Sequence, residues 1–293
     1  MARRYDTVSF LTDYGLDDEF VGVVKAVIRD LAPQATVIDL THGVRPYDVR
    51  GGSLALARAI SYVPEGVVLA VVDPGVGTTR RAIAIEVAGG GGVLVGPDNG
   101  LLAPAVAVVG GAERAVELAD PAFHLATPGA TFAGRDVFAP VVAHLCNGVE
   151  LAKLGPAVDP GLLLPGLVPL SRTEPDGVHT EVLWVDRFGN CQLNVTPDDL
   201  PDGDVLTAVI DGERRTAFRV TAYGDLGPGQ VGLVVDSQGL LALCLDQRSA
   251  ARELTLDTGD PVVIVAADGG TTESPAPSAT PVTMTPGRAP LDR

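Results

Sequence analysis

A run of apolar residues that ends abruptly at a carboxylate constrains this chain more than any other feature. Residues 67–72 are six consecutive apolar side chains, and Asp73-Pro74-Gly75 follows them directly. A run without a polar face is typical of a strand that is buried on both sides of a parallel sheet. Proline removes a backbone donor and glycine permits a tight turn, so we expect the strand to end at Asp73.

Asp73 is therefore expected at the carboxyl end of a central strand, where open α/β sheets bind ligands. An equally good interpretation of this stretch alone is a turn in which Asp73 only accepts hydrogen bonds from the next amides.

The first half of the chain alternates strand-like and helix-like patterns, which predicts a layered α/β domain over residues 1–154 with a mostly parallel central sheet. Asp48 is expected to cap the second helix. Four glycines at 89–92 favour a hairpin. Strands are expected at 8–12, 36–39, 67–72, 82–87 and 93–95, and helices at 20–31, 49–62, from Leu101, and up to Cys146.

The second half changes character. Residues 155–177, rich in proline, glycine and leucine, are interpreted as a linker. Short strands separated by turns then predict a β-barrel over residues 178–267, with a sandwich as the alternative. Residues 268–293 lack a core-forming run and are expected to be disordered. The strands are expected at 178–185, 191–195, 205–210, 217–220, 231–235, 240–245 and 261–265.

Composition excludes several classes of function. A net charge of −16 over 293 residues argues against nucleic acid as a partner. No apolar run is long enough to cross a membrane, and residues 1–6 do not resemble a signal peptide. The three cysteines, Cys146, Cys191 and Cys244, are odd in number and scattered, so we expect reduced thiols in a cytoplasmic protein.

Carboxylates in loops are the main candidates for chemistry: Asp13, Asp18, Asp73, Asp136 and Asp186. Asp13 follows the first strand and could accept hydrogen bonds from both hydroxyls of a ribose, although a helix-entry acid is the commoner role. Glycine-rich phosphate motifs are missing, so a nucleoside would bind without a phosphate grip. The four histidines show no metal-ligand spacing, and no metal or cofactor is expected.

A second candidate lies between two expected strands of the barrel, in Asp186-Arg187-Phe188-Gly189-Asn190. Phe188 could stack on a base, and the amide of Asn190 could pair with an adenine edge. The alternative is a hairpin turn with Gly-Asn chemistry and a core phenylalanine.

Six motifs occur in one order across residues 10–190: F-L-T-D-Y-G-L-D-D, R-P-Y-D-V, V-D-P-G-V-G-T-T-R-R, G-P-D-N-G-L-L, T-F-A-G-R-D-V-F-A-P and V-D-R-F-G-N. Together they resemble the S-adenosyl-L-methionine (SAM) hydroxide adenosyltransferases, or SAM hydrolases, which are relatives of the SAM-dependent fluorinase and chlorinase. The resemblance implies a seven-stranded α/β domain, a carboxyl-terminal β-barrel, and a homotrimer with active sites at subunit interfaces.

The reaction implied by the resemblance is attack of water or hydroxide on C5′ of SAM, which yields adenosine and methionine. SAM is then the substrate, and no cofactor is required. The resemblance places Asp13 on the ribose hydroxyls. It assigns Asp18, Asp186 and Ser237 to the amino-acid end of SAM, the last because the likeness extends through D-S-Q-G-L-L at Asp236. It assigns Tyr47, Phe132, Phe188 and Asn190 to the sugar and adenine pocket, and it also implies that Gly134 binds the substrate.

Asp73 and Arg80 match two members of the family's Asp-Arg-His triad, which positions and activates the water. The third member departs from the family, because T-F-H-G-R-D becomes T-F-A-G-R-D and Ala133 stands where the histidine would be. A methyl group can neither take a proton nor hydrogen-bond a water, so reduced activity is expected. Ala133 is interpreted as an introduced, substrate-trapping substitution or as a natural variant.

Two alternatives accompany this interpretation. One is a chlorinase-type halogenase, which Gly134 favours because the chlorinase has glycine there. Asp73 argues against it, because a buried carboxylate would repel an anion. The other is a SAM- or adenosine-binding protein without turnover, which the alanine at 133 favours.

Overall fold

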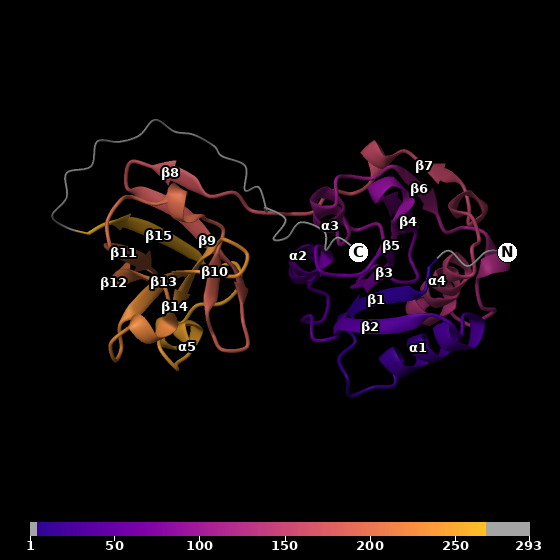
Figure 1. Cartoon of the computed structure of the whole chain (residues 1–293), viewed down its shortest axis with the longest axis horizontal. Helices are drawn as coiled ribbons and strands as arrows, with labels where there is room; N and C mark the ends of the chain where they lie inside the picture. The colour runs from indigo at the N-terminus through magenta and orange to yellow at the C-terminus, as the bar shows by residue number, and fades with distance from the viewer. Residues whose placement is uncertain (1–4, 268–293) are drawn as a thin grey trace. The chain divides into compact units, whose positions relative to one another are not determined.

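The computed structural model describes residues 5–267 and divides them into two compact units, the first ending at Val168 and the second beginning at Pro169 (Figure 1). The expected disordered tail, residues 268–293, lies outside the described residues. Within the described part of the chain, no helix is both long and apolar enough to cross a membrane.

The first unit is built on a seven-stranded sheet with the order β2-β1-β3-β5-β4-β6-β7. Strands β2, β1, β3, β5 and β6 run in one direction and β4 and β7 in the other, which confirms a mostly parallel sheet. The bounds are β1 (Thr7–Thr12), β2 (Thr36–Thr41), β3 (Gly66–Val71), β4 (Ala82–Val87), β5 (Gly92–Pro97), β6 (Arg114–Glu117) and β7 (Ala157–Val158).

Helices cover both faces of this sheet. On one face, α1 (Phe20–Leu31) and α4 (Ala139–Cys146) form a core with the strands, and on the other α2 (Val49–Ile60) and α3 (Ala103–Val108) form a second core (Figure 1). Strand β3 supplies both cores, because its side chains alternate between the two faces. Every residue of β3 is buried, which is the physical reason for its unbroken apolar run.

Most elements of the first unit match their sequence patterns. Helix α1 has the predicted bounds, and Asp48 caps α2 by accepting a hydrogen bond from the Gly51 amide at 2.7 Å. The glycine-rich segment joins β4 and β5 as an antiparallel hairpin, as predicted. Strand β6 was not predicted, because four residues with one charge at each end give too short a pattern.

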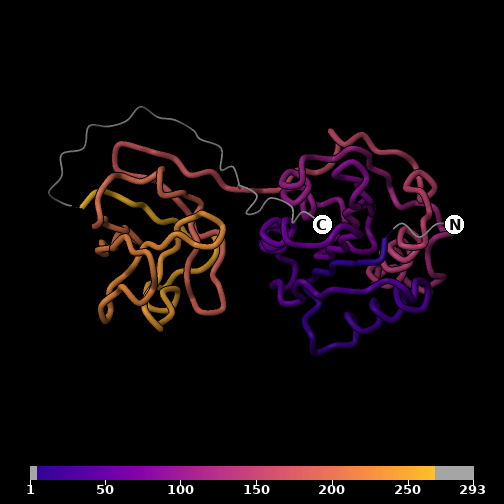
Figure 2. Tube along the Cα trace, in the orientation of Figure 1, coloured from indigo at the N-terminus to yellow at the C-terminus, as the bar shows by residue number. Residues whose placement is uncertain are grey.

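The second unit is a closed barrel (Figure 2). Its strands follow the order β10-β14-β13-β12-β11-β15-β9, and β9 pairs with β10 to close the circle. The barrel interpretation is therefore confirmed over the sandwich. The bounds are β9 (Gly177–Val185), β10 (Cys191–Leu193), β11 (Val205–Ile210), β12 (Glu213–Val220), β13 (Val231–Val235), β14 (Leu241–Cys244) and β15 (Pro261–Ala266).

Residues 155–177, interpreted as a linker, contain two short strands. Strand β7 pairs with β6 in the first unit, and β8 (Arg172–Glu174) pairs with β9 on the outside of the barrel. A short helix, α5 (Ala250–Leu254), follows β14 and was not predicted, because its five residues are too few to show a helical period.

Phe138 and Phe188 offer a matched test of this description, because Phe138 is fully buried in the first unit and Phe188 is 78% exposed in the second. We expect Phe138→Ala to lower the free energy of unfolding by about 3–5 kcal/mol, since the lost burial leaves a cavity. Phe188→Ala should change it by less than about 0.5 kcal/mol. Urea unfolding followed by circular dichroism measures both, and equal losses would contradict the fold.

Candidate active site

Two carboxylates lie at the same edge of the central sheet, where their strands end. Strands β1 and β3 are parallel neighbours in which Thr12 pairs with Val71, so Asp13 and Asp73 follow their strands at the carboxyl end. Burial raises the pKa of the Asp13 carboxyl, and the charge of Asp73 raises it further, while a hydrogen bond from the Tyr47 amide opposes them. The sheet therefore places both acids at its carboxyl edge, as predicted from the sequence, and their role in binding a ligand stays a prediction.

Asp73 is held by Arg80 through two hydrogen bonds. Arg80 Nε donates to Oδ1 at 2.9 Å, and Nη2 donates to Oδ2. The Asp73 side chain is only 5% exposed and that of Arg80 13%. Arg80 is itself fixed, because its Nη1 donates to the Arg81 carbonyl at 2.7 Å and its guanidinium lies 5.7 Å from the Phe138 ring centroid. The structure thus brings together the two predicted triad residues in a rigid, charge-assisted pair.

Asp13 receives its hydrogen bond from an unusual backbone. The amide of Tyr47 donates to Oδ2 of Asp13 at 2.9 Å, and Tyr47 has a φ of 68° with a side chain that is 75% exposed. A tyrosine in the left-handed region costs about 1–3 kcal/mol, and such strain gathers at functional sites. The Arg45-Pro46-Tyr47 loop is thereby fixed beside Asp13.

An aromatic cluster lies at the same edge. Tyr14, Phe20 and Phe132 contact one another with ring centroids 5.1–5.8 Å apart. Arg135 stacks over Phe132 at 5.1 Å and pairs with the buried carboxylate of Asp136, Nε to Oδ1 at 2.5 Å. Asp136, a candidate carboxylate in the sequence, is therefore engaged in a local ion pair.

Contacts with His42 hold the loop that carries Asp13 in place. The Thr12 hydroxyl lies 2.8 Å from Nδ1 of the buried His42 and accepts a hydrogen bond from the Tyr14 amide at 3.2 Å. The Gly15 amide donates to the His42 carbonyl at 2.8 Å. The sequence analysis did not single out Tyr14 or His42 as site residues. Tyr14 lies shortly after the predicted strand at 8–12, and His42 lies shortly after the predicted strand at 36–39.

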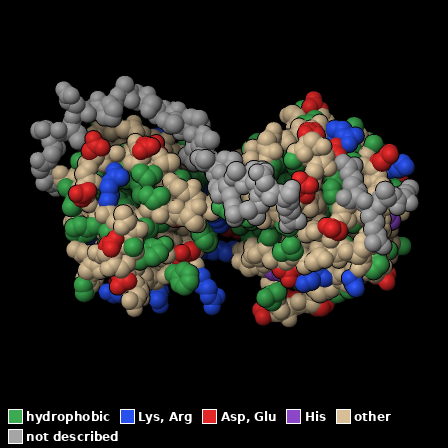
Figure 3. Space-filling model, viewed as in Figure 1, with side chains coloured by type: hydrophobic (Ala, Val, Ile, Leu, Met, Phe, Trp, Pro, Cys, Tyr) green, Lys and Arg blue, Asp and Glu red, His purple; other side chains and the backbone are tan. Residues whose placement is uncertain are grey.

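Ala133 is half-buried, directly before a π-helical turn over Gly134–Phe138. Its segment adjoins the Asp73 loop, because a β-carbon on Gly77 would lie 3.3 Å from the Ala130 carbonyl oxygen. Asp18, by contrast, is exposed in the loop before α1. Acidic side chains are scattered over the visible face of both units (Figure 3).

The remaining predicted site residues belong to the second unit. Asp186 organises its own loop: Oδ1 accepts from the amides of Phe188 and Asn190, and Oδ2 from Asn190 Nδ2, each at 2.8 Å. The hairpin-turn interpretation is therefore correct, but Phe188 is not a core residue, since it is 78% exposed. Ser237 is exposed in a similar loop, in which Asp236 accepts from the amides two and four residues later.

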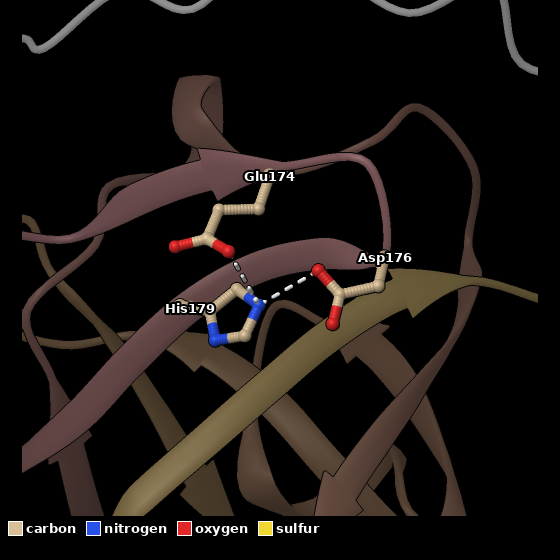
Figure 4. Close-up of side chains that lie close together, drawn as sticks. All are labelled: Glu174, Asp176 and His179. Atoms are coloured by element: carbon tan, nitrogen blue, oxygen red, sulfur yellow. Dashed lines mark hydrogen bonds and ion pairs between the residues drawn. The ribbon is translucent and has the colours of Figure 1, made fainter.

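A histidine–carboxylate group occupies the β8–β9 hairpin (Figure 4). His179 Nε2 lies 2.8 Å from Oδ1 of Asp176 and 3.8 Å from Oε2 of Glu174. The hydrogen bond from His179 lowers the pKa of the Asp176 carboxyl. These groups could hold a metal ion, but they include none of the predicted site residues, and the absence of a metal from the reaction stays a prediction.

Comparisons with known proteins point to one family. The family model for the SAM hydroxide adenosyltransferase N-terminal domain matches residues 8–155, and that for the C-terminal domain matches residues 180–263. An (R)-S-adenosyl-L-methionine hydrolase from Salinispora tropica is 49% identical over 259 residues, covering 88% of this chain and 97% of that protein.

More distant relatives fit the same picture. A fluorinase from an Actinoplanes species is 27% identical over 291 residues, covering 89% of this chain and 97% of that protein. A crystal structure of an uncharacterised conserved protein from Thermotoga maritima matches with a TM-score of 0.80 and 34% identity, covering 88% of this chain and 99% of that one.

The raised pKa of Asp13 predicts a stability effect. The carboxyl of Asp13 has a higher pKa in the folded than in the unfolded state. Its neutral form therefore contributes to the free energy of unfolding, and this contribution is lost as the pH rises through the folded pKa. Asp13→Asn keeps an acceptor for the Tyr47 amide without the charge. We therefore expect it to raise the unfolding free energy at pH 7.

That gain should shrink as the pH falls toward the ordinary carboxyl value of 3.8. The same substitution at the exposed Asp18 is the matched control and should change little. Urea unfolding at several pH values measures both variants. A gain for Asp13→Asn that grew on acidification would contradict the burial of this carboxylate.

Proposed function

Because this chain belongs to the SAM hydroxide adenosyltransferase family, we propose that it hydrolyses SAM to adenosine and L-methionine. The geometric observation that carries the proposal is the Asp73 carboxylate, held rigidly by Arg80 beside Asp13 at the carboxyl edge of the sheet. The higher identity to a named hydrolase than to a named fluorinase supports water over a halide as the nucleophile.

The proposed reaction is a displacement at C5′. The oxygen of water forms a bond to C5′ while the C5′–sulfur bond breaks, and its electron pair leaves with the sulfur of methionine. The sulfonium is a good leaving group, so the protein supplies alignment and a competent nucleophile. Asp73, oriented by Arg80, accepts a hydrogen bond from the water and takes up its proton.

Asp13 is proposed to bind the ribose hydroxyls, since it is half-buried and fixed by the Tyr47 amide. In the second unit, the exposed Phe188 ring is available to stack on adenine. Asn190 gives its amide donor to Asp186, which leaves its carbonyl oxygen for the adenine amino group. Asp186 and Ser237 would face the amino-acid end of SAM, together with Asp18.

A homotrimer with active sites at subunit interfaces is part of this proposal. Phe188 is 78% exposed, and three hydrogen bonds stiffen the loop that carries it. A large exposed aromatic side chain of this kind is suited to being covered by a ligand and a neighbouring subunit. Ultracentrifugation of the purified protein tests the assembly separately from its activity.

A cytoplasmic location is also proposed. Cys146, Cys191 and Cys244 are free and buried, and burial raises the pKa of their thiols to about 11, 12 and 11. The thiols therefore stay protonated and inert, as expected of structural cysteines in a reducing compartment.

A halogenase is the second candidate. Gly134 does not separate it from a hydrolase, because the hydrolase motif T-F-H-G-R-D has glycine at this position as well. A carboxylate that is 5% exposed at the nucleophile position opposes a halogenase, because a halide ion would meet a like charge in a poorly solvated site. A binding protein without turnover is the third candidate, favoured by the methyl side chain at Ala133.

Replacing the alanine by the family's histidine tests the triad. We expect Ala133→His to raise the rate of adenosine formation by ~10²–10⁴-fold, the usual contribution of a positioned acid–base group. Ala133→Leu, which adds bulk without an acid–base group, is the control and should give no gain. Asp73→Asn should abolish most of the gain, because triad members act as a unit.

Chromatography of the nucleosides formed from SAM decides among the candidates. Equal amounts of adenosine and methionine from the unmodified chain support hydrolysis, and a chlorinated nucleoside in added chloride would replace it by halogenation. Retained, unconverted SAM would favour the binding protein. An adenosine rate that Ala133→His leaves unchanged would refute the triad assignment.

A further inference from the structure

Tyr14 lies in this site, and the proposed function assigns it no role. It follows Asp13 directly, and its amide donates to the Thr12 hydroxyl at 3.2 Å. Its ring is wedged between Phe20 and Phe132, each with a centroid 5.8 Å away. Because backbone and ring are both fixed, packing sets the direction of the hydroxyl group.

The hydroxyl ends over the backbone of Gly134, the residue after Ala133. A β-carbon at residue 134 would overlap the Tyr14 hydroxyl oxygen, and it would lie 3.2 Å from Cζ of the ring and 3.3 Å from the Phe132 ring. Glycine at 134 therefore makes the space into which Tyr14 reaches, although the two residues are far apart in the sequence.

No hydrogen bond joins the Tyr14 hydroxyl to any residue between 5 and 267. The Tyr14 side chain is half-buried, and its hydroxyl oxygen is not among the enclosed polar atoms of the described residues, so this hydroxyl is open to a water or a ligand. Burial and the charges of Asp13 and Asp73 raise the pKa of Tyr14. The phenol therefore keeps its proton at physiological pH and can act as a hydrogen-bond donor.

We propose that the Tyr14 hydroxyl donates a hydrogen bond to the water that attacks C5′ of SAM, beside the position that the methyl side chain of Ala133 leaves without a polar group. The inference rests on the proposed function and adds a catalytic residue to it. It also gives Gly134 a role in hydrolysis, because this glycine leaves room for the Tyr14 hydroxyl.

The proton balance of this step leaves Tyr14 unchanged. One lone pair of the water oxygen accepts the hydrogen bond from Tyr14, and the other forms the bond to C5′. As the C5′–sulfur bond breaks, the proton of the water passes to Asp73. Tyr14 holds the oxygen in line with the reacting carbon and neither gains nor loses a proton.

The first test removes only the hydroxyl. We expect Tyr14→Phe to lower kcat for adenosine formation by about 10- to 100-fold, while KM for SAM changes little, since the bond is made to the nucleophile and not to SAM. Tyr62→Phe, at a tyrosine that is 57% exposed, is the matched control and should leave both constants unchanged.

The second test uses the contact with Gly134. Gly134→Ala should lower kcat as much as Tyr14→Phe does, because the new β-carbon displaces the hydroxyl. In the Tyr14→Phe background the same substitution should cost little more, because the overlapping oxygen is already gone. Thermal unfolding of each variant checks that its fold is kept.

The outcomes separate this inference from the proposed function. Adenosine formed equally fast by the unmodified chain and by Tyr14→Phe overturns the role of Tyr14 and leaves hydrolysis standing. No adenosine from the unmodified chain refutes hydrolysis itself. Losses that multiply in the double variant would show that Gly134→Ala acts by some route other than the hydroxyl, and would also overturn the inference.

Discussion

The burial of strand β3 on both faces is the constraint on which the rest of the first unit depends. Val67, Leu69 and Val71 pack into one core, and Val68 and Ala70 pack into the other. A strand clamped in this way cannot slip by one residue without exposing both sets. The packing of β3 therefore fixes the position of Asp73 at the end of this strand, and with it the start of the loop that follows.

The buried carboxylate then requires a partner. Removing a carboxylate from water is costly unless charge and hydrogen bonds compensate it, and Arg80 supplies both through two parallel bonds. The Phe138 ring holds the guanidinium, so the same residue that fills the core on one side supports the site on the other. The same side chain therefore contributes both to the stability of the sheet and to the orientation of the carboxylate.

The two units use different physical means to present side chains. In the first unit, rigid strands project their loops from a sheet edge, and the aromatic cluster of Tyr14, Phe20 and Phe132 fills the space between the loops. In the barrel, two hairpin loops are stiffened by an aspartate that accepts from the amides two and four residues later. An exposed ring such as Phe188 is thereby held in place without being buried.

The sequence by itself determined the elements whose pattern is local. The period of α1, the cap of α2 and the seven strands of the barrel follow from apolar spacing, turn residues and a capping aspartate, all within a few residues of one another. The motifs also indicated the family and the carboxylates. The roles of the individual site residues in the reaction stay predictions.

Only the tertiary structure decided the contacts between distant segments. Strands β6 and β7 form because a sheet edge is present to pair with, and the barrel closes because β9 can meet β10. The fit of Tyr14 over Gly134 is of the same kind, since neither residue carries a local signal of the other. Such contacts depend on the packing of whole elements, and a pattern that spans a few residues cannot encode it.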